Sequence, residues 1–230
     1  MTEKEFLESL QELNIEVTND KILKLKKYYD FLIEWNGKIN LTAITEKKEV
    51  YLKHFYDSLT LATIIDLNKI STLADVGTGA GFPGIIIKIF FPNIHMTLID
   101  SLNKRTEFLK IVIKELNLDN IEVLTSRAEE LKEREKYEVV TARAVANLHV
   151  LLEMLVPLSK KYVLLMKGDA TQELENTDNL YRELNIKLIE KKEFLLPFEK
   201  SKRTLLKYEK MAKTILKYPR NFGQMKKKPL

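Results

Sequence analysis

The sequence predicts an α/β protein: a seven-stranded, mainly parallel sheet that follows a helical N-terminal extension and ends in an antiparallel hairpin. Two patterns predict this class. From Ser71 onward, short apolar runs alternate with stretches of helical periodicity, which is typical of a parallel sheet covered by helices on both faces. Before Ile70, apolar residues recur at helical spacing instead. We therefore expect a helical cap over residues 1–67, a sheet domain over residues 68–211 and a basic C-terminal segment over residues 212–230.

Three helices are expected in the cap. Residues 2–5 (Thr-Glu-Lys-Glu) form a capping-box pattern, in which the threonine hydroxyl and the second glutamate each accept a bond from the other's backbone N–H. A second helix is predicted to begin near Thr18 and to end at Gly37, because glycine commonly stops a helix. After a loop at residues 40–43, a third helix is expected over residues 45–65.

The sheet domain is predicted from its short apolar runs. The expected strands are residues 71–76, 96–100, 121–125, 137–142, 162–166, 186–194 and 203–209. The expected helices between them are residues 83–91, 104–117, 148–158 and 172–184. Only the short stretch 196–202 joins the last two strands, so they are expected to form an antiparallel hairpin at the end of the sheet.

The composition excludes several chemistries. The 230 residues include no cysteine, so disulfides, cysteine-based metal sites and thiol nucleophiles are excluded. With only three histidines, we expect no metal site. The chain opens without a signal-peptide pattern, and no apolar run approaches the length of a membrane span. We therefore expect a cytoplasmic protein with no membrane partner.

The charge is concentrated at the C-terminus. The chain has 38 basic and 33 acidic residues, a net charge of +5. Residues 200–230 hold eleven basic residues and one acidic residue, whereas residues 1–199 hold 27 basic and 32 acidic residues. A concentrated basic segment favours an anionic partner such as nucleic acid, and a solvated tail is the alternative.

A glycine-rich loop follows the first predicted strand, at residues 75–84 (DVGTGAGFPG). Glycines at positions 77, 79 and 81 allow the backbone to turn sharply and to approach a ligand closely. Pro83 suits the first turn of the next helix, whose N-terminal amides favour an anionic group.

The spacing of these glycines distinguishes between cofactors. A dinucleotide fingerprint requires a third glycine where Phe82 stands, which argues against a nucleotide-dependent oxidoreductase. The observed spacing, with Asp75 two residues before the first glycine, resembles the first motif of Rossmann-like, class I methyltransferases that use S-adenosylmethionine (SAM). Asp100 ends the second predicted strand, where a carboxylate binds ribose hydroxyls. Residues 126–129 follow the third strand, where an adenine edge is usually read.

The missing motifs bear on the methyl acceptor. Methylation of pyrimidine C5 usually needs a cysteine nucleophile, and there is none. Residues 141–144 (Thr-Ala-Arg-Ala) replace the Asn/Asp-Pro-Pro-aromatic loop common in adenine-amine methylation. Ribose methylation often uses a Lys-Asp-Lys-Glu set; Lys167 is in place, but Arg143 stands where the acid is expected. Guanine N7 has its own lone pair and no proton to lose, so positioning alone can promote its methylation.

Five segments together resemble the bacterial RsmG family, also called glucose-inhibited division protein B: residues 35–44 (WNGKINLTAI), 54–59 (HFYDSL), 75–84, 100–105 (DSLNKR) and 143–146 (RAVA). The resemblance runs from about Leu32 to the C-terminus. It implies a SAM-dependent methyltransferase acting on N7 of a guanine in 16S ribosomal RNA. An RNA-binding ribosome-assembly factor that retains a SAM pocket, and a methyltransferase acting on another RNA, are the alternatives.

The resemblance also implies roles for single residues. Gly77 and Phe82 would line the methionine side of SAM, and Ala128 with Glu129 the adenine side. The full set of expected cofactor-binding residues is Asp75, Gly77, Gly79, Gly81, Phe82, Asp100, Ala128, Glu129 and Arg143. The expected RNA contacts are Asn40, Lys104, Arg105, Arg127, Lys167 and Arg220. No acid or base is assigned, and Arg143 and Asn40 are expected to position the reactants.

The C-terminal segment departs from the family pattern. Asn221 and Phe222 follow Arg220 where another basic residue and a proline are expected. Phe222 is suited to stacking on a base or to packing on the sheet. The expected partner is 16S rRNA or a small-subunit particle, and the expected state is a monomer.

Overall fold

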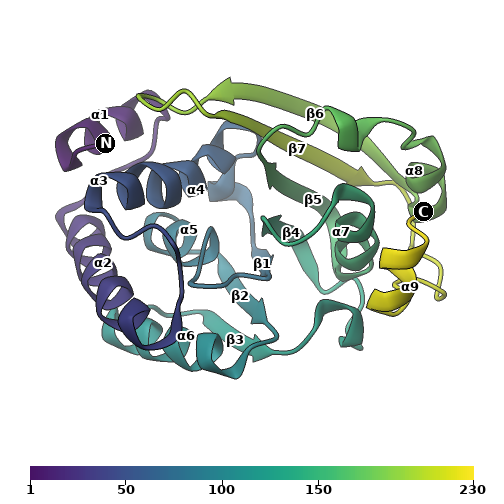
Figure 1. Cartoon of the computed structure of the whole chain (residues 1–230), viewed down its shortest axis with the longest axis horizontal. Helices are drawn as coiled ribbons and strands as arrows, with labels where there is room; N and C mark the ends of the chain where they lie inside the picture. Colours follow the sequence, from purple (N-terminus) through teal and green to yellow (C-terminus); the bar gives the residue numbers. More distant parts are fainter.

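The computed structural model describes residues 1–230 as three layers, with helices on both faces of one seven-stranded sheet (Figure 1). The strand order is β3-β2-β1-β4-β5-β7-β6. The strands are β1 (Thr72–Val76), β2 (His95–Asp100), β3 (Ile121–Thr125), β4 (Tyr137–Arg143), β5 (Ser159–Lys167), β6 (Ile186–Leu195) and β7 (Lys202–Lys210). β1 to β5 pair in parallel, whereas β7 is antiparallel to both β5 and β6. The predicted fold and its final hairpin are therefore confirmed.

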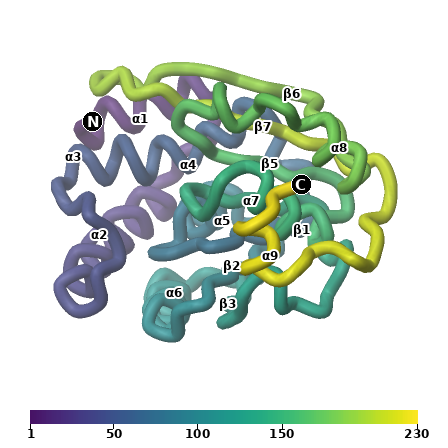
Figure 2. The backbone as a smooth tube through the Cα atoms, turned by 45° about the vertical axis from the view of Figure 1, so that its right-hand side comes forward, coloured from purple at the N-terminus to yellow at the C-terminus, as the bar shows by residue number.

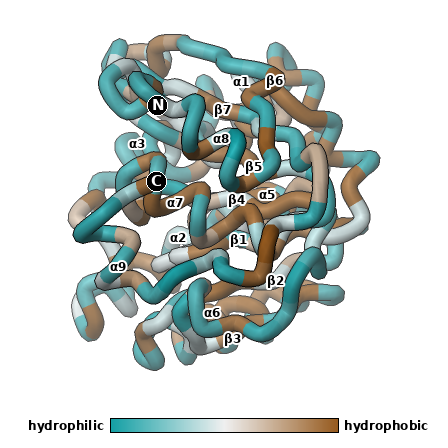
Figure 3. Tube along the Cα trace, turned by 90° about the vertical axis from the view of Figure 1, so that its right-hand side faces the viewer, coloured by the Kyte–Doolittle hydropathy of each residue, from teal (hydrophilic) through white to brown (hydrophobic).

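Two apolar cores lie on opposite faces of the sheet. One face is covered by α1 (Glu3–Glu12), α2 (Asn19–Ile39), α4 (Asp57–Leu59), α5 (Gly84–Phe90) and α6 (Asn103–Glu115), and the other by α7 (Leu148–Leu155), α8 (Asp178–Leu184) and α9 (Phe222–Lys227). Side chains of β1 alternate between the cores, with Leu73 in the first and Ala74 in the second. Burial on both faces explains the apolar runs of the central strands, such as residues 163–166 of β5. Figure 3 shows these apolar residues concentrated around β1, β4 and α7.

The N-terminal helices follow the predicted starts more closely than the predicted ends. The capping box of α1 is present, with the Thr2 N–H donating to Glu5 and the Glu5 N–H donating to the Thr2 hydroxyl. The predicted stop of α2 at Gly37 is wrong, because the helix continues to Ile39 and ends at Asn40, which has a left-handed φ of 47°. Asparagine adopts this conformation more readily than most residues that carry a side chain.

The third predicted helix is not a continuous α-helix. It begins as α3 (Lys47–Val50), widens to a π-helical segment (Tyr51–Tyr56), returns to α4 and closes with a 3-10 turn (Thr60–Thr63). π-helical turns occur often at functional sites. The segment turns His54 and Asp57 toward the end of β4, as the site below shows.

The predicted helix over residues 172–184 is also divided. A 3-10 turn (Gln172–Leu174) is separated from α8 by Asn176, whose φ is 56°. A single left-handed residue interrupts the helical hydrogen-bond pattern. None of the helices has the combination of length and apolar composition that a membrane span needs.

The C-terminal segment packs against the body and is not a solvated tail. It runs beside α7 in both views and ends in α9 (Figures 1 and 2). Tyr218 and Met225 are buried in the same core as α7. The Arg134 guanidinium donates to the backbone carbonyls of Tyr218 and Thr214 at 2.7 and 3.0 Å. These contacts join the segment to the sheet domain. The division into three units stays a prediction.

Candidate functional site

The glycine loop leaves the carboxyl end of β1 in the left-handed region. Gly77, Gly79 and Gly81 have φ values of 68°, 60° and 107°, which L side chains rarely adopt. A Cβ at Gly77 would lie 2.5 Å from a methyl group of Val145, so this glycine also permits a close approach between two loops. The Tyr28 hydroxyl of α2 donates to the Ala80 carbonyl at 2.5 Å and supports the loop from the N-terminal cap.

Asp75 is fully buried beneath the glycine loop. One of its carboxylate oxygens accepts hydrogen bonds from the Thr78 hydroxyl at 2.6 Å and from the Gly84 N–H at 2.8 Å. Complete burial raises the pKa of Asp75 to about 6, although these hydrogen bonds oppose the shift. Asp75 therefore ties the two ends of the loop together, which differs from the expected contact with a cofactor.

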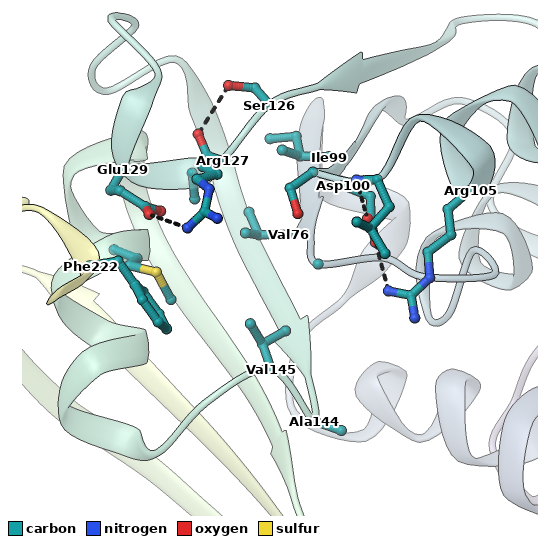
Figure 4. Close-up of a pocket in the computed structure, with 15 residues that line it drawn as sticks. Val76, Ile99, Asp100, Arg105, Ser126, Arg127, Glu129, Ala144, Val145 and Phe222 are labelled. Carbon is teal, nitrogen blue, oxygen red and sulfur yellow. Dashed lines mark hydrogen bonds and ion pairs between the residues drawn. The ribbon is translucent and has the colours of Figure 1, made fainter. Parts of the chain in front are cut away.

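A pocket of about 370 Å³ opens beside the glycine loop, at the carboxyl ends of β1, β2 and β4 (Figure 4). Ligands bind at this edge in open α/β sheets. Four of the predicted cofactor residues line it: Gly77, Asp100, Ala128 and Glu129. Gly79, Gly81, Phe82 and Arg143 are not among its lining residues. We call it the cofactor pocket.

Asp100 is held at the wall of the cofactor pocket. It is 4% exposed, and its two oxygens accept hydrogen bonds from the N–H groups of Gly79 and Leu102, both at 2.9 Å. The Arg105 guanidinium lies 3.5 Å from the same carboxylate. Arg105, predicted to contact RNA, thus lines the cofactor pocket.

Arg127 and Glu129 lie at another part of the same wall (Figure 4). Their charged groups are 3.7 Å apart, and Glu130 is 4.0 Å from the Arg127 guanidinium. Arg127 was also predicted to contact RNA, and the structure places it in the cofactor pocket beside these two acids. Val145, Met154 and Phe222 line the pocket without having been predicted to do so.

A second pocket, of about 390 Å³, adjoins the first at Ala144, which lines both. Arg143 at the end of β4 lines only this second pocket. Its guanidinium donates to the Lys53 carbonyl at 3.0 Å, to Asp57 at 3.2 Å and to the His54 ring at 3.2 Å. We call it the acceptor pocket, because a substrate there would lie next to the cofactor pocket.

His54 is neutral in this arrangement. Burial, and then the Arg143 charge, lower its pKa to about 3. Nδ1 lies 3.2 Å from both the Arg143 guanidinium and the Lys53 carbonyl. A guanidinium only donates, so we assign Nδ1 as the acceptor from Arg143 and the ring proton to Nε2, which donates to the Thr42 hydroxyl at 2.9 Å. The ring stacks on Phe82 with centroids 4.4 Å apart. Phe82 is therefore buried against His54 and lines neither of the two pockets.

Several residues of this network were missed by the sequence reasoning. Asp57 joins Arg143 to Arg203, whose guanidinium donates to it at 3.1 Å. The side-chain oxygen of Asn36 accepts from the N–H groups of Leu41 and Thr42 at 2.7 and 2.8 Å. Asn40, the predicted site residue, is exposed at the end of α2. The segments 35–44 and 54–59 carried the signal for Asn36 and Asp57, and the role of Asn40 in RNA contact stays a prediction.

The other predicted RNA contacts differ in how exposed they are and in whether an acidic side chain already pairs with them. Lys104 is exposed at the start of α6. Lys167 is 9% exposed and pairs with Glu173 at 2.8 Å at the acceptor pocket. Arg220 donates to both oxygens of the buried Glu153. No group of three or more acidic or histidine side chains is placed to hold a metal ion.

The fold is shared with solved methyltransferase structures. The magnesium protoporphyrin IX methyltransferase of Synechocystis, solved with bound SAM, is 13% identical, with a TM-score of 0.58, over 84% of this chain and 98% of that chain. A SAM-dependent methyltransferase of Aquifex aeolicus is 16% identical, with a TM-score of 0.52, over 72% and 94% of the two chains. These matches define the fold as that of the class I, SAM-dependent methyltransferases.

Its particular family follows from closer relatives. The family model described as "GidB: rRNA small subunit methyltransferase G" matches residues 21–206. The ribosomal RNA small subunit methyltransferase G of Lysinibacillus sphaericus is 46% identical over the whole of both chains. That of Bacillus subtilis is 45% identical over 100% of this chain and 99% of its own length. The chain therefore belongs to the rRNA small subunit methyltransferase G family, as its sequence motifs predicted.

Proposed function

We propose that this chain transfers the methyl group of SAM to N7 of a guanine in 16S ribosomal RNA of the small subunit. The single observation that carries the proposal is full-length similarity at 46% identity to a ribosomal RNA small subunit methyltransferase G. Two adjoining pockets that meet at Ala144 provide a place for each reactant.

SAM is proposed to occupy the cofactor pocket. The Asp100 carboxylate would accept hydrogen bonds from the ribose hydroxyls, as an acid at this strand end does in related folds. Ala128 and Glu129 would border the adenine, and Gly77 the methionine end. The pocket then directs the methyl group toward Ala144 and the acceptor pocket.

The guanine is proposed to enter the acceptor pocket. Methyl transfer forms a bond from N7 to the methyl carbon while the bond from that carbon to sulfur breaks, and no proton leaves the base. The neutral His54 fits this reaction, because its ring nitrogens are engaged by Arg143 and Thr42 and no general base is needed. The remaining N–H groups of Arg143 are suited to guanine O6 or a phosphate. Positioning is then the main source of rate enhancement.

The RNA surface is proposed to surround the acceptor pocket. Asn40 and Lys104 are exposed and suit direct contacts with RNA. Lys167 belongs to the pocket wall and would reach RNA only by exchanging its partner Glu173. We further propose that the chain is cytoplasmic and acts as a monomer. Residues of one chain line both pockets, which supports the monomer. Light scattering behind size-exclusion chromatography tests the oligomeric state.

The proposed function is tested with labelled SAM and small-subunit RNA that lacks the modification. We expect incorporated label to be recovered as 7-methylguanosine after nuclease digestion. Naked 16S rRNA, an assembly intermediate and the mature subunit are compared as substrates. RNA binding without any incorporation on all three substrates would favour an assembly factor and contradict the proposal.

A further inference from the structure

Phe222 is an aromatic side chain on the wall of the cofactor pocket that the proposed function does not use. It is the first residue of α9 and is 37% exposed, although the helix otherwise packs against α7. Figure 4 shows its ring beside Glu129, on the side of the pocket away from Asp100 and Arg105. This part of the pocket is the one assigned above to adenine.

The position of Phe222 is fixed by the residues before it. The Arg220 backbone N–H and Nε donate to one oxygen of Glu153 at 2.9 and 2.8 Å, and its Nη2 donates to the other at 2.6 Å. The Glu153 side chain is 1% exposed, so Arg220 neutralises a buried charge on α7. Asn221 then caps α9 by accepting from the Gln224 N–H at 2.9 Å. The backbone is thus held on both sides of the Phe222 side chain.

We infer that Phe222 is a cofactor-contacting residue that packs on the adenine of SAM, with Arg220 and Glu153 as its positioning pair. The inference rests on the proposed occupancy of the cofactor pocket. Adenine is the planar, uncharged end of SAM, whereas its other end carries an ammonium, a carboxylate and a sulfonium. A planar, uncharged ring packs well on an aromatic side chain, and Phe222 lies in the part of the pocket assigned to adenine, away from Asp100 and Arg105.

This role separates two functions within the basic C-terminal segment. Arg220 and Phe222 face α7 and the cofactor pocket, whereas Lys226, Lys227 and Lys228 are exposed. The segment therefore completes the methyl-donor site through its first part and leaves its terminal lysines free for an anionic partner.

The direct test is calorimetric titration of the full chain with S-adenosylhomocysteine, the demethylated product. Phe222→Ala should raise the Kd about ten-fold, and Phe222→Trp should keep it near the wild-type value. The same loss is expected with methylthioadenosine, which keeps the adenine but lacks the amino-acid end. Phe198→Ala is the matched control, because Phe198 is 60% exposed and does not line the pocket.

The positioning pair is tested by a double-mutant cycle. Arg220→Gln together with Glu153→Gln removes the pair without leaving a buried charge, and thermal denaturation confirms that the variant folds. If the pair acts through Phe222, adding Phe222→Ala to this variant raises the Kd by much less than it does in the wild type. Full additivity would overturn the positioning role.

The outcomes separate this inference from the proposed function. A folded Phe222→Ala variant with wild-type affinity for both ligands would overturn the inference and leave the proposed function standing. If the Phe222→Ala variant lost RNA affinity and kept its affinity for S-adenosylhomocysteine, Phe222 would be an RNA contact. That result would also overturn the inference. A wild-type chain that binds no S-adenosylhomocysteine would contradict both.

Discussion

Arg143 connects the reacting pocket to residues far away in the sequence. It binds Asp57, 86 positions earlier, which also binds Arg203, 146 positions after Asp57. The position of Arg143 at the end of a strand was readable from the sequence, as were Asp100, Ala128 and Glu129 in the cofactor pocket. Asp57 and Arg203 were not, because an ion pair between distant segments has no local pattern.

Arg143→Lys should reduce kcat/KM for rRNA by about a hundred-fold and leave the Kd of S-adenosylhomocysteine within two-fold. Lysine keeps the charge but cannot reach the Lys53 carbonyl, Asp57 and His54 together, and Arg143 does not line the cofactor pocket. Steady-state kinetics measures kcat/KM for rRNA, and calorimetry measures the Kd of S-adenosylhomocysteine. If the variant instead bound S-adenosylhomocysteine more weakly and kept its kcat/KM for rRNA, Arg143 would act in the cofactor pocket, which would contradict the account.

His54 makes stability depend on pH with a definite sign. Its folded pKa of about 3 lies below the usual value, so in acid the unfolded chain takes up a proton that the folded chain refuses. This contribution is fully present above about pH 6.5 and is lost as the pH falls toward 3. Between pH 6 and 4 it weakens stability by about 1.4 kcal/mol per pH unit.

The His54→Gln variant isolates this effect, because glutamine does not titrate. Urea denaturation between pH 7 and 4 should show a smaller decrease in unfolding free energy for the variant than for the wild type. Parallel curves for the two chains would mean that His54 is protonated in the folded state.

The glycine loop shows how elements constrain one another. Its position after β1 was predicted from spacing, but its contacts with α2 and with the loop after β4 depend on the assembled sheet. The interruptions of the predicted helices were missed for a similar reason. Nothing local in residues 51–56 signals a π-helical turn, and its residues Tyr51 and Phe55 are buried in the core against distant segments.

Gly77→Ala should weaken binding of S-adenosylhomocysteine at least ten-fold, because it combines a positive φ with a Cβ only 2.5 Å from Val145. Adding Val145→Ala relieves the contact but not the backbone strain, so partial recovery is expected. Gly79→Ala is the comparison, since its φ is also positive but nothing lies within 4 Å of the added atom. Equal losses at both glycines would show that strain alone decides the effect.

At the scale of the whole molecule, the net charge of +5 combines a mildly acidic body with a basic end. The charge pattern predicted an anionic partner, and could not show that Arg220 is used internally against Glu153. That pairing required the fold, because Glu153 lies on a helix 67 residues earlier. The exposed Lys226, Lys227 and Lys228 remain available for RNA.

Replacing these three lysines with glutamine should weaken rRNA binding and lower the slope of log K against log salt by about two to three. Affinity for S-adenosylhomocysteine should not change, because none of the three lines the cofactor pocket. Filter binding across a salt series checks the slope. An unchanged slope would mean that these lysines are simply solvated.

The central claim, methylation of a guanine at N7 in 16S rRNA, is tested most directly by mass-spectrometric mapping of 16S rRNA from a strain without this chain. We predict that one 7-methylguanosine present in the parent is absent from the deletion strain. The wild-type chain should restore it, and the Arg143→Lys variant should restore little of it. A deletion strain that keeps every 7-methylguanosine of the parent would contradict the account.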